Sequence, residues 1–181
     1  MVSNMKAVII NGGYSLSSRI MGIEQEIKAL LNREQLNYEV ISVHQLNAKD
    51  LLTANFKSLE IIETVEIIQN SEIIFVLTPI FKGSYSGILK TYLDVLPQKV
   101  FENKIVVPVA IGGSIAHLLA LEYSLKPLLS ILGATKISNP IYVVDQQIEY
   151  VSEQQYKVAD EIKTRLQQVW DQIHYRPVVA N

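Results

Sequence analysis

The amino-acid sequence predicts an α/β protein in which a doubly wound parallel sheet of five strands carries helices on both faces. Five short apolar runs alternate with five stretches whose apolar residues recur at helical spacing. The run Ile73–Leu77 is apolar at every position, which is typical of a strand covered on both faces. No internal repeat or low-complexity segment interrupts this alternation, so we expect one domain over residues 1–181.

The first half of the chain contains three of the expected strands. They lie at Lys6–Ile10, Tyr38–Val43 and Ile73–Leu77. The third strand is expected to end at Thr78-Pro79, because Pro79 has no N–H to donate to a ladder. Apolar residues at helical spacing predict two helices, the first through Ile20, Ile23, Ile27, Leu30 and Leu31 and the second through Ile61, Val65 and Ile68. Residues 44–55 are expected to be irregular.

The second half supplies the remaining elements. A helix is expected from Ile88 to Leu96, and a fourth strand at Ile105–Ala110. A strongly apolar helix follows from about Ile115 to Leu132, and Ile137–Val144 forms the fifth strand. The clearest helical stripe of the chain then comprises Tyr156, Ala159, Ile162, Leu166, Val169 and Ile173.

Right-handed crossovers leave two main topologies for this alternation, Rossmann-like and flavodoxin-like, the latter with strand order 2-1-3-4-5. In both, ligands bind beyond the carboxyl ends of the strands. Binding residues are therefore expected just after the first, third and fourth strands.

Composition excludes several classes of protein. The formal charge of -2 lacks the basic excess of a nucleic-acid binder. The absence of cysteine excludes disulfides, thiolate nucleophiles and iron–sulfur centres. No apolar run is long enough to cross a membrane, and the start of the chain has no export signal, so we expect a cytoplasmic protein. Hydrophobic residues make up 49% and charged residues only 19%, which hints at a homo-oligomer.

The loop after the first strand reads Asn11-Gly-Gly-Tyr-Ser-Leu-Ser-Ser-Arg19 and opens a helix. Hydroxyls and a guanidinium at the amino end of a helix favour the binding of an anion, and phosphate is the expected ligand. The loop matches neither the dinucleotide fingerprint nor the Walker pattern. Its expected contacts are Gly13, Ser15, Ser17, Ser18 and Arg19. The alternative is that Ser17 or Ser18 merely caps the helix.

The loop after the third strand alternates apolar or aromatic residues with Gly, Ser and Pro. Such a loop suits the face and rim of a flat heterocycle. Its expected binding residues are Thr78, Pro79, Ile80, Phe81, Lys82, Gly83, Ser84 and Tyr85. The alternative is that Phe81 and Tyr85 only pack the following helix.

The loop after the fourth strand supplies Gly112, Gly113 and Ser114, with His117 nearby. The glycine N–H groups are expected to donate to the far edge of the ligand, although a tight left-handed turn would explain the glycines equally well. None of the three loops carries Asp or Glu. No metal site is therefore expected, and the loops have no carboxylate to act as a general acid or base in hydrolysis. Such a site suits chemistry carried by a cofactor.

Two long segments resemble a known family. They read Thr78-Pro-Ile-Phe-Lys-Gly-Ser-Tyr-Ser-Gly-Ile-Leu-Lys-Thr91 and Gly112-Gly-Ser-Ile-Ala-His-Leu-Leu-Ala-Leu-Glu-Tyr-Ser-Leu-Lys-Pro127. With Asp94-Val-Leu-Pro97, they make the chain similar to the NAD(P)H-dependent FMN reductases of the flavodoxin-like superfamily, and most similar to the alkanesulfonate-utilisation type.

The resemblance implies a homodimeric or homotetrameric enzyme that reduces FMN with NADPH or NADH. Reduced FMN would then leave for a two-component monooxygenase that desulfonates alkanesulfonates. The first loop would hold the FMN phosphate and the other two the isoalloxazine. The chain departs from the family pattern at Gly13-Tyr14-Ser15, where Ser-Pro-Arg is usual, and at Phe81, where the family often has Tyr.

Pro127 has no N–H, so an α-helix would leave the Tyr123 carbonyl without its partner. We expect a kink or a π-bulge at Tyr123. The resembling reductases carry such a tyrosine in a π-bulge at a subunit interface, where it is thought to loosen FMN. The alternative is an interface packing residue beside an ordinary proline kink.

The hypothesis is hydride transfer from the nicotinamide C4 to the flavin N5, with orientation and N–H donors supplied by the protein. No side chain is expected to be an essential acid or base. Two alternatives remain open: a quinone, azo-dye or metal-ion reductase that retains its FMN, and a non-enzymatic flavodoxin-like electron carrier, which a charge of -2 fits poorly. A nucleotide-binding domain without turnover is a third.

Overall fold

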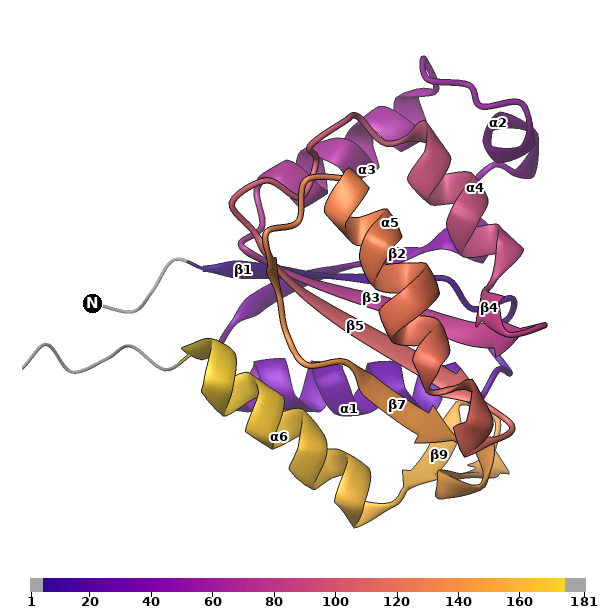
Figure 1. The fold of residues 1–181 in the computed structure, drawn as a ribbon, viewed down its shortest axis with the longest axis vertical. Coiled ribbons are helices and arrows are strands. Elements are labelled where there is room, and N and C mark those ends of the chain that lie inside the picture. Colours follow the sequence, from indigo (N-terminus) through magenta and orange to yellow (C-terminus); the bar gives the residue numbers. More distant parts are fainter. Residues whose placement is uncertain (1–4, 175–181) are drawn as a thin grey trace, which may run out of the picture.

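The sheet lies at the centre of the molecule, with helices on both sides (Figure 1). The computed structural model describes residues 5–174. The expectation that the chain has no export signal concerns residues 1–4, which lie outside this range. The strands of the main sheet are β1 (Lys6–Asn11), β2 (Asn37–Ser42), β3 (Ile73–Phe81), β4 (Ser84–Tyr85), β5 (Ile105–Gly112), β6 (Lys136–Ile137) and β7 (Ile141–Val144). The helices are α1 (Ile20–Arg33), α2 (Ala48–Leu52), α3 (Leu59–Gln69), α4 (Gly87–Val95), α5 (Lys126–Ile131) and α6 (Asp160–His174).

The sheet has seven strands, where the sequence predicted five. Its order is β2-β1-β3-β5-β6, with β4 paired to β3 and β7 paired to β5. All pairs are parallel except β3 with β4. The expected fifth strand is split, because β6 pairs with the start of β5 and β7 with its end. Pro140, which has no N–H, lies between the two halves. Parallel strands in this order, with helices on both faces, form a flavodoxin-like arrangement.

The third strand continues through Pro79, contrary to the sequence prediction. The Leu77 carbonyl accepts the Gly12 N–H at 2.8 Å, so Leu77 faces β1. Pro79, two residues later, faces the same side but lies beyond the end of β1. Its missing N–H therefore leaves no gap in the ladder, and β3 runs on to Phe81 beside β5.

Three helical predictions need correction. The segment 44–55, expected to be irregular, contains α2. The apolar helix expected from Ile115 to Leu132 begins as a 3₁₀ turn at Ile115–His117, becomes a π-helix at Leu121–Leu125 and continues as α5. Tyr156, the first residue of the last predicted stripe, lies instead in a hairpin formed by β8 (Ile148–Ser152) and β9 (Gln155–Val158). Ala159 precedes α6, and Ile162, Leu166, Val169 and Ile173 are confirmed as residues of that helix.

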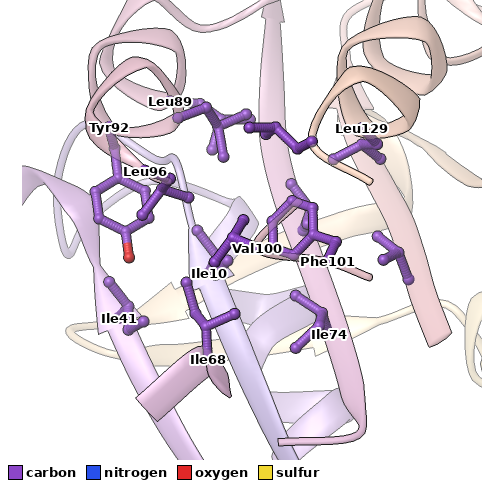
Figure 2. Packing of buried hydrophobic residues seen from close by; sticks show 14 of the residues in the cluster. Ile10, Ile41, Ile68, Ile74, Leu89, Tyr92, Leu96, Val100, Phe101 and Leu129 are labelled. Carbon is purple, nitrogen blue, oxygen red and sulfur yellow. The ribbon is translucent and has the colours of Figure 1, made fainter. Parts of the chain in front are cut away.

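Each face of the sheet has its own hydrophobic core. Helices α3, α4 and α5 cover one face, and α1 and α6 cover the other (Figure 1). On the first face, Leu89, Tyr92 and Leu96 of the α4 segment pack over Ile10 and Ile74 of the strands (Figure 2). These cores fix the positions of the strand ends, and hence of the loops that follow them.

A buried hydrogen-bonded junction joins those strand ends to α4. The Ser86 hydroxyl accepts the Leu89 N–H at 3.1 Å as the N-cap of α4 and donates to the Gly12 carbonyl at 2.7 Å. The Ser86 N–H donates to the Thr78 hydroxyl at 2.9 Å. Thr78 and Ser86 are both buried. The first and second loops are therefore held to each other through α4.

Replacing Ser86→Ala should lower the free energy of unfolding by about 2–3 kcal/mol, because it removes a helix cap and leaves a buried carbonyl unpaired. Urea unfolding followed by circular dichroism measures the change. Ser130→Ala serves as the matched control, because the exposed Ser130 hydroxyl donates only to the Lys126 carbonyl of its own helix. An Ser86→Ala effect no larger than the control would contradict the role of the junction.

Candidate functional site

The first loop enters the site through a tight turn in which both glycines are buried. The Gly13 N–H donates to the Asn11 side-chain oxygen at 2.8 Å. A Cβ at Gly13 would lie 2.7 Å from Ile20 Cγ2 and 2.9 Å from Asn11 Oδ1. Gly13 is therefore required for close packing of the turn. Its N–H is used within the turn, where it donates to Asn11.

The serines of this loop do not cap α1. The N-cap of the helix is Arg19, and no side chain accepts a hydrogen bond there. The Ser15 and Ser17 hydroxyls lie 3.1 Å apart, and both residues reach the surface. Ser18 is buried, whereas Arg19 is exposed. The structure thus brings Ser15 and Ser17 together as a pair of hydroxyls and contradicts the capping alternative.

A hollow of about 480 Å³ lies beside this loop. Its lining combines the loop with the end of β2 and with the β8–β9 hairpin, and comprises Tyr14, Ser15, Leu16, Ser17, His44, Gln45, Tyr150, Glu153 and Gln154. The hairpin is fastened to the loop, since the Tyr156 hydroxyl donates to the Leu16 carbonyl at 3.2 Å. Gln25 of α1 also donates to the Gln154 carbonyl at 2.8 Å.

Sequence reasoning missed the hairpin wall of this hollow. The pattern that marks it is the alternation of apolar and polar residues in 148–150 and again in 156–158, around the polar stretch 152–155. The helical spacing of Tyr156 with Ala159 and Ile162 concealed it. Gly22 of α1 allows the close approach, because a Cβ there would lie 2.9 Å from Tyr156 Cβ.

The second loop is a two-residue hairpin turn between β3 and β4. Lys82 and Gly83 have φ angles of 51° and 78°, as a type I′ turn requires. Thr78 and Pro79 are buried beneath the turn, and the Thr78 hydroxyl donates to the Pro79 carbonyl at 2.9 Å. Phe81, Lys82 and Gly83 are exposed at the turn, whereas Ile80, Ser84 and Tyr85 beside it are partly buried.

The two aromatic residues of this loop differ in their packing. Tyr85 is half-buried against the core on the α4 side, as the packing alternative held. Phe81 is 49% exposed, and its ring lies 5.7 Å from that of Tyr14. Tyr14 belongs to the stretch Gly13-Tyr14-Ser15, at which the chain departs from the pattern of the family it resembles, and Phe81 is the other departure. The structure brings the rings of Tyr14 and Phe81 together between the first and second loops.

The third loop is shaped by a tyrosine beneath it. Tyr142 is buried, and its hydroxyl donates to the Ser114 carbonyl at 2.6 Å. Burial, together with the Asp145 carboxylate, raises the pKa of Tyr142, so the phenol remains a donor. A Cβ on Gly112 would lie 2.4 Å from the Tyr142 hydroxyl oxygen. Gly112 and Gly113 have no positive φ, so close packing at Gly112, and not a left-handed turn, explains the glycine there.

Two further residues were expected near this loop. His117 is exposed in the 3₁₀ turn. Tyr123 is 77% exposed at the centre of the π-helix, in which the Lys126 N–H reaches back five residues to the Leu121 carbonyl. The widened turn removes the conflict with Pro127, so the π-bulge expected at Tyr123 is present.

A second hollow, of about 570 Å³, lies at the amino ends of β1 and β2, where three carboxylates, those of Glu39, Glu63 and Glu66, accompany Lys6. Within residues 5–174, no three His, Asp or Glu side chains are grouped as metal ligands. No helix of the same range has the length and apolar character needed to cross a membrane.

Replacing Gly112→Ala should displace the third loop and lower the free energy of unfolding by about 2 kcal/mol, because the new methyl group collides with the Tyr142 hydroxyl. The double substitution Gly112→Ala with Tyr142→Phe removes that oxygen and should recover part of the loss. Thermal unfolding of the two single variants and the double variant measures the coupling. Strict additivity of the two single effects would show that the collision does not shape the loop.

Comparisons with known proteins identify the family of the chain. The family model described as NADPH-dependent FMN reductase matches residues 5–149. An Escherichia coli K12 protein named FMN reductase (NADPH) is 33% identical over 96% of this chain and 93% of its own length. A Pseudomonas putida KT2440 protein of the same name is 38% identical over 81% of this chain and 74% of its own.

Among solved structures, the apo form of an NADH:FMN oxidoreductase (EMOB) superposes with a TM-score of 0.81 at 29% identity. The match covers 98% of this chain and all of that one. The resemblance carried by the loops after β3 and β5 is therefore confirmed at the level of the family. The chain belongs to the NADPH-dependent FMN reductase family.

Proposed function

We propose that this protein reduces FMN with NAD(P)H and releases the reduced flavin to a two-component monooxygenase of the alkanesulfonate type. The observation that carries the FMN-binding part of the proposal is the pair of Ser15 and Ser17 hydroxyls. They lie together at a hollow beside the start of α1. In a member of this family, two hydroxyl donors next to a helix N-terminus suit the phosphate of FMN. The exposed guanidinium of Arg19 adds a positive charge nearby.

The other two loops would hold the isoalloxazine. The hairpin turn presents Ile80 and Phe81 as apolar surface, and the loop at Gly112–Ser114 presents backbone that Tyr142 holds in place. When bound, the flavin itself accepts the hydride at N5 from the nicotinamide C4. The chain would contribute orientation and backbone donors toward the edge of the ring where negative charge develops. Lys82, Tyr85 and His117 are not required as an acid or a base in this proposal.

The choice of nicotinamide remains open in the proposal. Two of the relatives are named for NADPH, and the solved structure is named for NADH. A cytoplasmic location stays a prediction. The principal alternative is an enzyme that retains its FMN and passes electrons to a quinone, an azo dye or a metal ion.

Purified protein should oxidise NADPH only when FMN is added, and the steady-state pattern should be sequential. Added FMN is required because the reduced flavin leaves after each turnover and a new FMN molecule must bind. Initial rates of NADPH oxidation at 340 nm, with FMN and NADPH both varied, provide the measurement. A yellow protein with ping-pong kinetics would instead support the flavin-retaining alternative.

The variant Ser15→Ala/Ser17→Ala tests the phosphate site within the same assay. It should raise the KM for FMN by about tenfold or more, because hydrogen bonds to a charged group are lost. Ser138→Ala is the control, because the exposed Ser138 hydroxyl donates to the adjacent Asn139 carbonyl, outside the three loops. Equal KM values for the double variant and the control would exclude the hydroxyl pair from FMN binding.

The proposal also includes self-association through the π-helix and its flanks. Tyr123, Ile115, Leu119 and Ile131 are each more than half exposed, although they are large and apolar. Apolar surface of this kind is typical of a contact between subunits. The resemblance implies that a tyrosine in such a π-bulge loosens FMN, and we propose this role for Tyr123.

The substitution Tyr123→Glu should reduce the molecular mass in solution toward that of a monomer, because a charge is costly in an apolar interface. Light scattering coupled to size-exclusion chromatography measures the mass. Val151→Glu, at an exposed apolar residue of the hairpin, is the matched control. An unchanged mass for Tyr123→Glu would place the subunit contact elsewhere or exclude one.

A further inference from the structure

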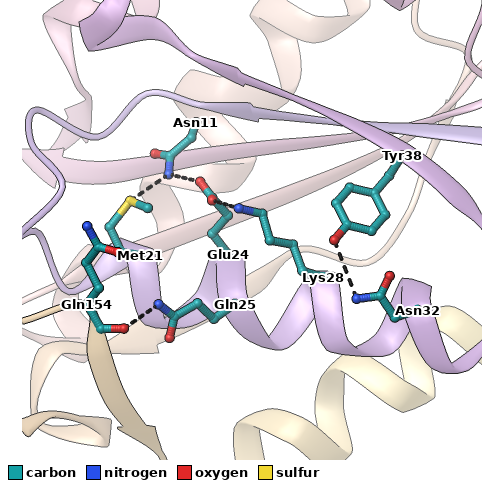
Figure 3. Close-up of polar contacts among 8 residues, drawn as sticks. All are labelled: Asn11, Met21, Glu24, Gln25, Lys28, Asn32, Tyr38 and Gln154. Carbon is teal, nitrogen blue, oxygen red and sulfur yellow. Dashed lines mark hydrogen bonds and ion pairs between the residues drawn. The ribbon is translucent and has the colours of Figure 1, made fainter.

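A buried polar network lies directly behind the first loop (Figure 3). Asn11, the last residue of β1, is fully buried, and Glu24 of α1 is 1% exposed. The Asn11 amide nitrogen donates to a Glu24 carboxylate oxygen at 2.5 Å and approaches the Met21 sulfur at 3.4 Å. Neither Asn11 nor Glu24 is among the residues expected to touch a ligand. Burying a carboxylate costs free energy because the charge loses its contact with water, so its position calls for an explanation.

Glu24 determines which way the Asn11 amide points. An asparagine amide has a donor end and an acceptor end, whereas a carboxylate only accepts. Glu24 therefore holds the NH₂ group toward α1 and leaves the Asn11 oxygen facing the loop. There it accepts the Gly13 N–H at 2.8 Å. A reversed amide would place its NH₂ group against the Gly13 N–H, so the turn depends on the carboxylate.

Lys28 balances the charge of this carboxylate. Its ammonium lies 2.5 Å from the second Glu24 oxygen, one helical turn further along α1. Lys28 is about one-third exposed, whereas the carboxylate is buried. The ion pair allows a negative group to lie behind a loop that would bind an anion, because the pair has no net charge.

We propose that Glu24 is a positioning residue for the phosphate of FMN. It does not contact the phosphate. It orients Asn11, Asn11 fixes the turn at Gly13, and the turn places the Ser15 and Ser17 hydroxyls that lie two and four residues later. This inference rests on the proposed function, since it assigns Glu24 to the phosphate half of the FMN site. The isoalloxazine half, formed by the other two loops, is independent of it.

The test compares the dissociation constants of FMN and of riboflavin, which lacks the phosphate. The ratio of the two constants isolates the phosphate contribution, and a general loss of structure would not change it selectively. Glu24→Met removes the acceptor and should reduce the preference for FMN over riboflavin by about tenfold, as expected for one hydrogen bond. Glu24→Gln keeps an acceptor oxygen and should change the preference by less than about threefold.

A second pair of variants tests the direction of the hydrogen bond. Asn11→Asp keeps the acceptor for the Gly13 N–H but sets two carboxylates against each other, so the preference for FMN should fall. Asn11→Asp combined with Glu24→Gln exchanges donor and acceptor and restores the original charge, and should recover most of the lost preference. Glu26→Met is the matched control, because Glu26 is on the same helix but faces Lys163 at 3.9 Å.

The outcomes separate this inference from the function on which it rests. If the unmodified protein binds riboflavin as tightly as FMN, the proposed phosphate site itself is wrong. If the unmodified protein prefers FMN over riboflavin, the phosphate site stands. In that case, an equal preference in Glu24→Met and Glu26→Met refutes the role of Glu24. Should Glu24→Met fail to fold, the Asn11 pair decides, and a double variant no better than Asn11→Asp overturns the proposal.

Discussion

The candidate site depends on the junction at which the ends of β1 and β3 meet the start of α4. Gly12 donates its N–H to the Leu77 carbonyl at 2.8 Å, and its own carbonyl accepts the Ser86 hydroxyl at 2.7 Å. A Cβ at Gly12 would lie 2.6 Å from Leu89 Cβ, so only glycine allows the three segments to come so close. Because the junction is buried, the loops leave it in fixed directions. The exposed hydroxyls and ring of the site are thus positioned by residues that no ligand touches.

Side chains outside the contact surface also hold the first and third loops. Tyr142 holds the third loop from beneath, Tyr156 holds the first loop from the side, and Asn11 holds it from behind. In each case a buried or half-buried polar side chain binds a backbone group of the loop. Rigid support of this kind lowers the entropy lost when a ligand binds. It also explains why residues outside the three loops are expected to affect binding.

The class of fold and the location of the three loops could be predicted from periodicity, because buried parallel strands and amphipathic helices have distinct apolar patterns. Periodicity left Rossmann-like and flavodoxin-like strand orders open, and the family resemblance favoured the second. The details that failed depend on partners far along the chain. Pro79 is tolerated only because β1 ends beside it, and Tyr156 has helical spacing by coincidence while its neighbour across a hairpin is Tyr150. The left-handed turn that was the alternative explanation for Gly112 is absent, and close packing against the distant Tyr142 explains the glycine. Glu24 could not be assigned from sequence, because nothing local shows that it reaches Asn11.

The central claim is that the loop after β1 binds the phosphate of FMN and that the other two loops bind its ring. A crystal structure of the complex with FMN tests this claim most directly. Phosphate oxygens are expected within hydrogen-bond distance of the Ser15 and Ser17 hydroxyls, with the isoalloxazine between Phe81 and Gly112. FMN bound at the amino ends of the strands, among Lys6, Asn37 and Asn70, or with its phosphate remote from the first loop, would contradict it.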